Sequence, residues 1–161
     1  MRYVMRQKLL SFGDDFTIKN DRGDEVFFVD GRLISIGDKL SFEDMEGNEL
    51  ARIRQRLLTI GKTYEIERGG HTTVVHKHLF TPFTCKFSID VPGRNDLEAK
   101  GNLLDHEYQI RDARGRVVAE VSKRWFRFTD TYGVDIAPGH DDVTVLATAV
   151  VIDLCCHEDK D

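Results

Sequence analysis

Cysteine is scarce in this sequence and unevenly placed. The three cysteines are Cys85 and the adjacent pair Cys155 and Cys156. This odd number lacks the spacing of a disulfide framework, which favours a reducing compartment. The start, MRYVMRQKLL, also lacks the apolar segment and cleavage site of a secretory signal, and position 2 is not the glycine that N-myristoylation requires. We therefore expect a cytoplasmic protein.

Catalytic motifs are missing as well. The sequence has no P-loop, no G-x-G-x-x-G after a strand, no G-x-S-x-G and no H-E-x-x-H. We therefore expect no enzymatic activity, no catalytic residue and no cofactor. The net charge of -5 argues against a generic nucleic-acid binder, which would usually be basic, although it allows a local basic patch.

The composition is that of one globular domain spanning residues 1–161. Apolar residues make up 40% and charged residues 32%, which excludes a disordered chain and a membrane protein. A chain of this length buries roughly two-thirds of its unfolded surface, so it needs no disulfide or metal to fold. Proline is rare, at 3, whereas the 13 glycines stand between short apolar runs and indicate turns.

Three stretches share one hairpin pattern: FTIKNDRGDEV, LSFEDMEGNEL and YQIRDARGRVV. In each, Asn or Asp follows an apolar residue by two positions, Gly comes three later, and another apolar residue three after that. Asx residues favour the start of a turn and Gly supplies a positive φ, so each stretch predicts a tight β-hairpin centred on Gly23, Gly47 or Gly115.

A longer repeat relates two halves of the chain. A shift of 68 residues places the second hairpin on the third and aligns LARIRQRLLTIGKTYEI with VAEVSKRWFRFTDTYGV. We expect the halves to divide at DVPGRND, residues 90–96. About twelve or thirteen short strands fall between positions 3 and 136 without an intervening helix, which predicts a sandwich or a barrel.

The most apolar run lies at the far end. Eleven of the 14 residues from Val143 to Cys156 are apolar or Cys, and as a helix they would span about 21 Å, too short to cross a bilayer. Asp141 or Asp142 would cap such a helix. One more strand is the alternative, since half of the 14 are Val, Ile or Thr. A helix at about 142–156, apolar on all sides, fits the inside of a barrel.

The paired halves, the segment SIGDKLSFEDMEGNELARIRQRLLTIGKTYEI and a terminal apolar helix containing VVID together resemble the LURP-one-related family. That family is similar in fold to the tubby C-terminal domain and to phospholipid scramblases. The resemblance covers nearly the whole chain. It implies a mainly β fold, a closed antiparallel barrel of about twelve strands in two pseudo-repeated halves around a buried C-terminal helix. A barrel filled in this way would bind ligands on its outside or at a rim.

The candidate ligand site is the row Arg52, Arg54 and Arg56 in ARIRQR. On a strand the three share one face, where guanidinium groups suit phosphate. By analogy with tubby domains, which bind phosphoinositides, the row would hold an anionic headgroup, although the tubby lipid-contact motif does not match here. The alternative is a solvated face paired with Glu or Asp across the sheet. Lys62 and Arg68 could extend the row.

Other polar features have plainer interpretations. KRWFRF suggests either a core strand with Trp125 inward or a membrane or nucleic-acid surface. His76 and His78 share a strand face but lack the further ligands of a zinc site, so we expect surface histidines and no metal. Asp153 is the one charge in the apolar run, and we expect it to lock the helix to the barrel or to lie near a mouth of the barrel. Cys155 and Cys156 would be inert core residues.

Two functional hypotheses follow. The first is a non-enzymatic module that binds an anionic phospholipid headgroup or a membrane surface. The second is a structural or stress-related protein–protein interaction module with no lipid role. Nucleic acid is expected as a partner of neither, and the sequence leaves the oligomeric state open.

Overall fold

The computed structural model describes residues 1–10, 13–31, 39–78, 86–93, 96–124 and 131–157, except for the side chains of 8–10, 13, 14 and 157. Within these residues the chain forms twelve strands followed by one helix. Their bounds are β1 (Arg2–Leu10), β2 (Gly13–Lys19), β3 (Glu25–Asp30), β4 (Lys39–Asp44), β5 (Glu49–Arg56), β6 (Thr63–Arg68), β7 (His71–His78), β8 (Lys86–Asp90), β9 (Leu97–Asn102), β10 (Glu107–Asp112), β11 (Val117–Ser122), β12 (Thr131–Ile136) and α1 (Asp142–His157).

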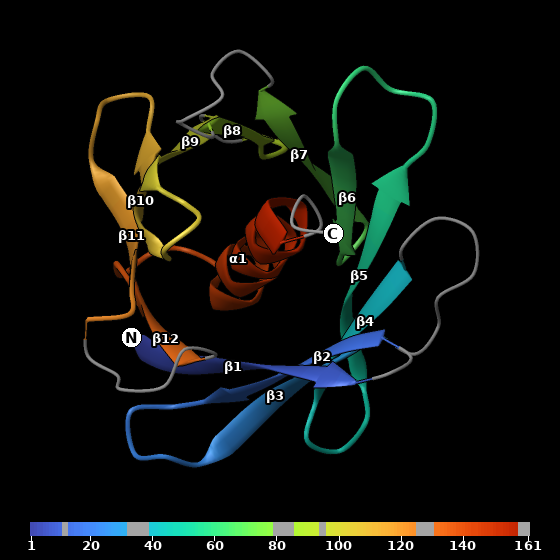
Figure 1. Ribbon diagram of the computed structural model, residues 1–161, viewed down its shortest axis with the longest axis vertical. Helices are drawn as coiled ribbons and strands as arrows, with labels where there is room; N and C mark the ends of the chain where they lie inside the picture. Colours follow the sequence, from blue (N-terminus) through green and yellow to red (C-terminus); the bar gives the residue numbers. More distant parts are fainter. Residues whose placement is uncertain (11–12, 32–38, 79–85, 94–95, 125–130, 158–161) are drawn as a thin grey trace.

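The strands form a closed antiparallel barrel (Figure 1). Each strand pairs with its neighbours in sequence, and β12 pairs with β1 to close the sheet, with Met5 opposite Tyr132. The predicted barrel is therefore confirmed. Because consecutive antiparallel strands are joined by short turns, successive turns alternate between the two ends of the barrel.

The 68-residue repeat corresponds to matching strands. β4, β5 and β6 each begin 68 residues before β10, β11 and β12. The barrel thus consists of two runs of six strands, which meet at the Gly69–Gly70 turn between β6 and β7. Residues 90–96, where we expected the division, instead join β8 to β9. Their Pro-Gly pair is one more hairpin signal, which the sequence could not distinguish from a boundary.

The three Asx-Gly hairpins have the same turn. The side-chain oxygen Oδ1 of Asn20, Asp44 and Asp112 accepts hydrogen bonds from the backbone N–H groups two and four residues later, at 2.9–3.0 Å. Gly23 and Gly47 follow with φ of 85° and 84°. This left-handed conformation explains why glycine stands at the same position in each of the three turns. All three turns lie at the same end of the barrel, since each joins an even-numbered strand to an odd-numbered one.

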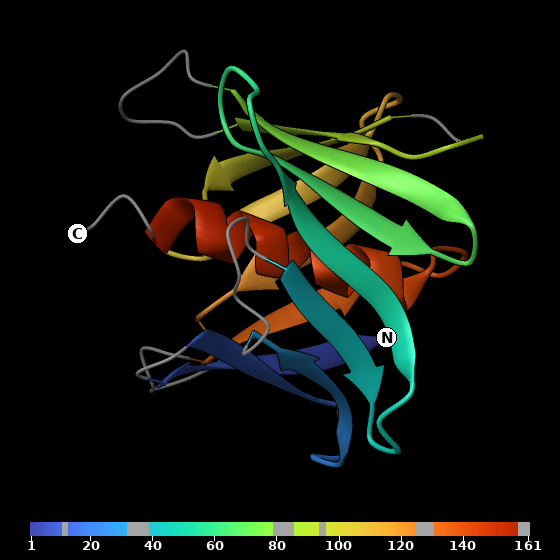
Figure 2. The ribbon, with the colours of Figure 1, turned by 90° about the vertical axis from the view of Figure 1, so that its right-hand side faces the viewer.

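The helix α1 lies inside the barrel and runs along it (Figures 1 and 2). All its residues from Val145 to Cys156 are buried, as is Val143. They pack against inward-facing strand residues such as Phe16, Tyr64 and Phe87 in one continuous core. The predicted range, 142–156, differs from α1 by one residue. Burial on every side overrides the low helix propensity of its β-branched residues.

The interior is therefore filled by the chain itself. Among the described residues, no helix has both the length and the apolarity needed to cross a membrane.

Candidate functional site

The predicted arginine row lies on the outer wall of the barrel, along β5. Arg52, Arg54 and Arg56 are exposed, whereas Ala51 and Ile53, which alternate with them along the strand, are buried. This alternation follows from the two-residue period of a strand and confirms that the three arginines share a face.

Glutamates from β6 lie opposite the row. Arg54 Nη2 is 2.6 Å from Glu67 Oε1 and 3.3 Å from Glu65 Oε2. Arg56 donates two hydrogen bonds to Glu65 Oε1, at 2.6 and 2.9 Å. Hydrogen bonding from Arg56 is the main cause that lowers the pKa of Glu65, and it outweighs burial, which would raise it. The chain thus supplies its own anions to this face, and headgroup binding by the row stays a prediction.

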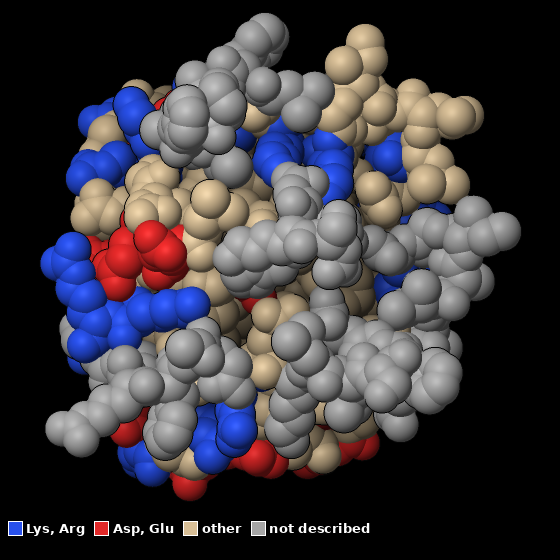
Figure 3. Space-filling view, viewed as in Figure 1, with Lys and Arg blue, Asp and Glu red and all other residues tan. Residues whose placement is uncertain are grey.

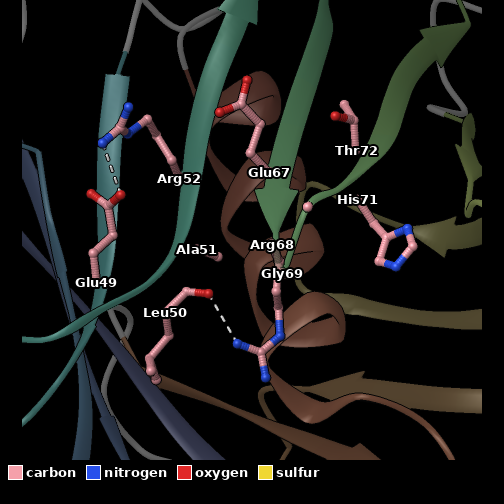
Figure 4. A pocket seen from close by; sticks show the side chains of 10 residues that line it. Glu49, Leu50, Ala51, Arg52, Glu67, Arg68, Gly69, His71 and Thr72 are labelled. Atoms are coloured by element: carbon pink, nitrogen blue, oxygen red, sulfur yellow. Dashed lines mark hydrogen bonds and ion pairs between the residues drawn. The ribbon is translucent and has the colours of Figure 1, made fainter.

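A hollow of about 440 Å³ opens beside Arg52 (Figure 4). It is lined by Glu49–Arg52 and Glu67–Thr72. Arg52 Nη2 lies 3.0 Å from Glu49 Oε1, and Arg68 donates a hydrogen bond to the Leu50 carbonyl at 2.9 Å. Because the two arginines face two glutamates across this hollow, it carries little net positive charge for an anionic ligand.

Arg68 also connects the hollow to the start of the helix. Its guanidinium group binds the Asp141 carboxylate, which in turn accepts hydrogen bonds from the N–H and hydroxyl groups of Thr144. Burial alone would raise the pKa of Asp141, but the hydrogen bonds from Arg68 and Thr144 lower it overall. Asp141 is therefore the predicted N-cap, and Asp142 instead accepts a hydrogen bond from the Tyr3 hydroxyl at 2.6 Å.

A second hollow, of about 540 Å³, lies at the same end of the barrel, between β8–β11 and the first turn of α1. Its apolar lining includes Val91, Leu97 and Val145. Asp112 also lines this hollow, and its carboxylate forms an ion pair with Arg116 at 2.7 Å. The charges in this hollow serve the turn between β10 and β11 and the helix cap.

The other end of the helix is held by buried polar groups. Asp153 forms a hydrogen bond with His106 Nε2, and the His106 ring stacks on Tyr132 with centroids 4.3 Å apart. The buried Lys77 donates a hydrogen bond to the Cys155 carbonyl at 3.2 Å, which places a cation at the negative end of the helix dipole. The expectation that Asp153 ties the helix to the barrel is confirmed.

The remaining sequence candidates carry no arranged chemistry. His76 Nδ1 lies 2.7 Å from the Thr63 hydroxyl, and His78 hydrogen-bonds Ser88. In the part of the chain that the structure describes, no three metal-ligating side chains come together. Cys155 and Cys156 are buried in the core, as expected. Trp125 lies outside the described residues.

The described residues at the two ends of the barrel differ in charge, a difference that no pattern in the sequence indicated. The comparison uses the described turn residues and the first and last residue of each strand. The end where the helix finishes has six cations, Lys39, Arg56, Lys62, Lys86, Lys123 and Arg124, and three carboxylates, Asp30, Asp105 and Glu107. The end where the helix begins has six cations, Arg2, Lys19, Arg22, Arg68, Arg114 and Arg116, and ten carboxylates, Asp21, Asp24, Glu25, Asp44, Glu46, Glu49, Asp90, Asp96, Asp112 and Asp141.

We call these the basic end and the acidic end. Figure 3 faces the basic end, where Lys and Arg side chains lie around much of the rim. The net charge of -5 hides this segregation. Of the cations at the basic end, the sequence pointed to Arg56 and Lys62 as part of the arginine row, and to Lys123 and Arg124 within KRWFRF. It did not place these cations at one end, because that depends on knowing which turns lie together.

The fold and its surfaces define a class of protein: a closed antiparallel barrel filled by its own helix, with its hollows and charged groups on the outer wall and at the two ends. The family model described as LURP-one-related matches residues 1–153. The chain therefore belongs to the LURP-one-related family, and the resemblance seen in the sequence is confirmed.

Two known proteins are similar to this chain over most of its length. The uncharacterized protein YxjI of Bacillus subtilis (strain 168) is 36% identical over 157 residues, covering 98% of this chain and 94% of that protein. The X-ray structure of the Arabidopsis thaliana protein AT5G01750 has a TM-score of 0.67 at 16% identity, covering 94% of this chain and 90% of that one. The second likeness is one of fold.

Proposed function

We propose that this protein is a non-catalytic binding module for anionic phospholipid surfaces, and that it meets them with its basic end. The observation that carries the proposal is the charge segregation between the barrel ends, where the described residues include six cations and three carboxylates at one end and six cations and ten carboxylates at the other. An anionic surface attracts the first end and repels the second, so it would orient the barrel.

Sedimentation with vesicles tests the proposal. The protein is mixed with vesicles of phosphatidylcholine alone or with added phosphatidylserine, at low and moderate salt. Binding only to the anionic vesicles, weakened by salt, is the expected result because exposed charges are screened within about 10 Å at 0.1 M salt. Equal binding to both vesicles would contradict it, and absence of binding would favour the protein–protein alternative.

Two variants with the same change in net charge locate the site. Lys39 and Lys123 become Gln in one, and Arg52 and Arg54 become Gln in the other. Each cation near an anionic membrane contributes about 1 kcal/mol, so the lysine variant should bind about 30-fold more weakly. The arginine variant should lose much less, because glutamates already face these two arginines. The reverse order would assign the site to the row.

A further inference from the structure

The turn between β5 and β6, residues 57–62, exposes three large apolar side chains. Leu58 and Ile60 have relative exposures of 106% and 90%, and Leu57 of 54%. We call this turn the β5–β6 tip. It stands out at the upper right of Figure 1, where the surface in Figure 3 is neither acidic nor basic. It belongs to the basic end, since it joins an odd-numbered strand to an even-numbered one.

Folding does not account for a leucine at position 58. Leu58 has a φ of 64°, in the left-handed region that glycine and asparagine adopt readily and that is unfavourable for a bulky side chain. Its side chain gains nothing from burial within the chain, because it is fully exposed. An exposed apolar side chain on an unfavourable backbone indicates that something outside the folded chain is its partner.

The tip nevertheless has a defined backbone. The Thr59 hydroxyl donates a hydrogen bond to the Gly61 carbonyl at 3.0 Å, and the Arg56 carbonyl lies 3.4 Å from the same hydroxyl oxygen. Gly61 takes a φ of 84° and completes the turn. The hydrogen bonds within the turn thus hold its backbone, so less backbone freedom remains to be lost on binding.

Charge decides which partner suits the tip. Residues 57–62 contain no acidic residue, and Arg56 and Lys62 flank the apolar side chains. Among the residues that the structure describes there, the basic end around them has six cations and three carboxylates. A second copy docking the same end would bring like charges together. An anionic bilayer instead offers negative headgroups at the level of the cations and hydrocarbon below them, the arrangement that interfacial anchors use.

We infer that the β5–β6 tip enters an anionic phospholipid bilayer, with Leu57, Leu58 and Ile60 below the headgroups and Arg56 and Lys62 among them. The inference rests on the proposed function and adds to it the segment that leaves water. It predicts that binding has an apolar component that salt does not remove, and that the barrel is oriented with the basic end toward the membrane.

Depth-dependent fluorescence quenching tests the inference. Leu58→Trp is compared with Met45→Trp. Met45 lies at the acidic end, and its relative exposure is 52%. Both are measured against the wild type, which shares Trp125, on anionic vesicles with brominated acyl chains. The tryptophan at 58 should be quenched and shifted to shorter wavelength, whereas the tryptophan at 45 should be unchanged.

A second pair of variants measures affinity. Leu58→Ser combined with Ile60→Ser should weaken vesicle binding about tenfold or more for each side chain, because each loses the transfer of most of its apolar surface from water. Met45→Ser should leave binding unchanged, and circular dichroism should show both proteins folded.

The outcomes separate the two proposals. If the protein sediments with anionic vesicles but tryptophan 58 is quenched no more than tryptophan 45, the inference is wrong and the proposed function stands. If no vesicle binds the protein, both are wrong. If the wild type forms a concentration-dependent dimer that Leu58→Ser with Ile60→Ser abolishes, the tip is a contact between copies and the inference is wrong.

Discussion

The guanidinium group of Arg68 donates two hydrogen bonds to the carboxylate of Asp141, at 2.7 and 3.1 Å. Arg68 ends β6, and Asp141 caps the helix, so this bidentate pair joins the barrel wall to the element that fills it. The same carboxylate accepts a hydrogen bond from the Thr144 N–H at 3.3 Å. Asp141 therefore has two separable roles, a helix cap and an ion-pair partner.

Substitution of Asp141 should separate these roles. Asp141→Ala removes both, and we expect the free energy of unfolding to fall by about 1–2 kcal/mol, as for other lost caps. Asp141→Asn should lose about 1 kcal/mol or less, because Asn caps helices well and the ion pair is partly exposed. Urea unfolding followed by circular dichroism measures both. Equal losses would show that the cap contributes nothing.

Acid should remove the difference in stability between the wild type and Asp141→Asn. The pKa of Asp141 is lower in the folded protein than its ordinary value of 3.8. The ionised group therefore stabilises the fold fully above that value, and the contribution is lost as the pH falls through the lower, folded pKa. The difference in stability between wild type and Asp141→Asn should be present at pH 6 and vanish toward pH 2. A difference independent of pH would contradict this.

The buried hydrogen bond between His106 and Asp153 should be strongly coupled. Asp153→Leu leaves the His106 ring buried without this partner, and we expect a loss of about 2–3 kcal/mol. His106→Phe should have a comparable effect. The double variant should lose less than the two losses added together, by at least about 1 kcal/mol, because neither polar group is then left behind. Additive losses in denaturant unfolding would show that the pair does not act as a unit.

Because of the backbone conformation at Leu58, the residue that is best for stability at this position should differ from the residue that is best for binding. Leu58→Gly should raise the free energy of unfolding by about 1 kcal/mol, because glycine accepts a φ of 64° without strain. Leu57→Gly is the matched control, because Leu57 does not have the positive φ of Leu58. This substitution should lower the free energy of unfolding or leave it unchanged. Thermal unfolding measures both. A destabilised Leu58→Gly would show that the leucine serves the fold after all.

Local patterns in the sequence determined much of the fold. The Asx-Gly pattern identified three turns, because the side chains of Asn20, Asp44 and Asp112 accept hydrogen bonds from backbone N–H groups within the next four residues. The apolar run 143–156 identified the buried helix, since a segment apolar on all sides has no solvent-facing side. The alternation of Arg52, Ala51 and Ile53 identified the outer face of β5.

Contacts between distant segments were beyond the reach of the sequence. Asp153 was recognisable as a buried charge that needs a partner, but nothing local marked His106, 47 residues away, as that partner. The glutamates that neutralise the arginine row, Glu65 and Glu67, follow from the register of β5 with β6. The charge of an end is likewise a sum over turns that only the closed topology brings together.

Gly101 should tolerate no side chain, because β9 and β10 pack closely there. It lies opposite Tyr108 with a φ of 140°, and a Cβ atom at this position would be 2.7 Å from the Glu107 carbonyl oxygen and 2.8 Å from Tyr108 Cα. Both are backbone atoms, so Gly101→Ala must push the strands apart next to the turn that carries His106. We expect a loss of more than about 2 kcal/mol in unfolding free energy.

Gly115→Ala is the control for backbone conformation alone. Gly115 has a φ of 79°, and a Cβ atom there would meet nothing within 4 Å. Alanine at 115 should therefore cost about 1 kcal/mol, from the left-handed conformation only. The difference between the two variants in denaturant unfolding measures the close approach of β9 and β10. If both substitutions cost the same, that approach relaxes freely, and the turn holding His106 against the helix is not positioned by the pairing of these strands.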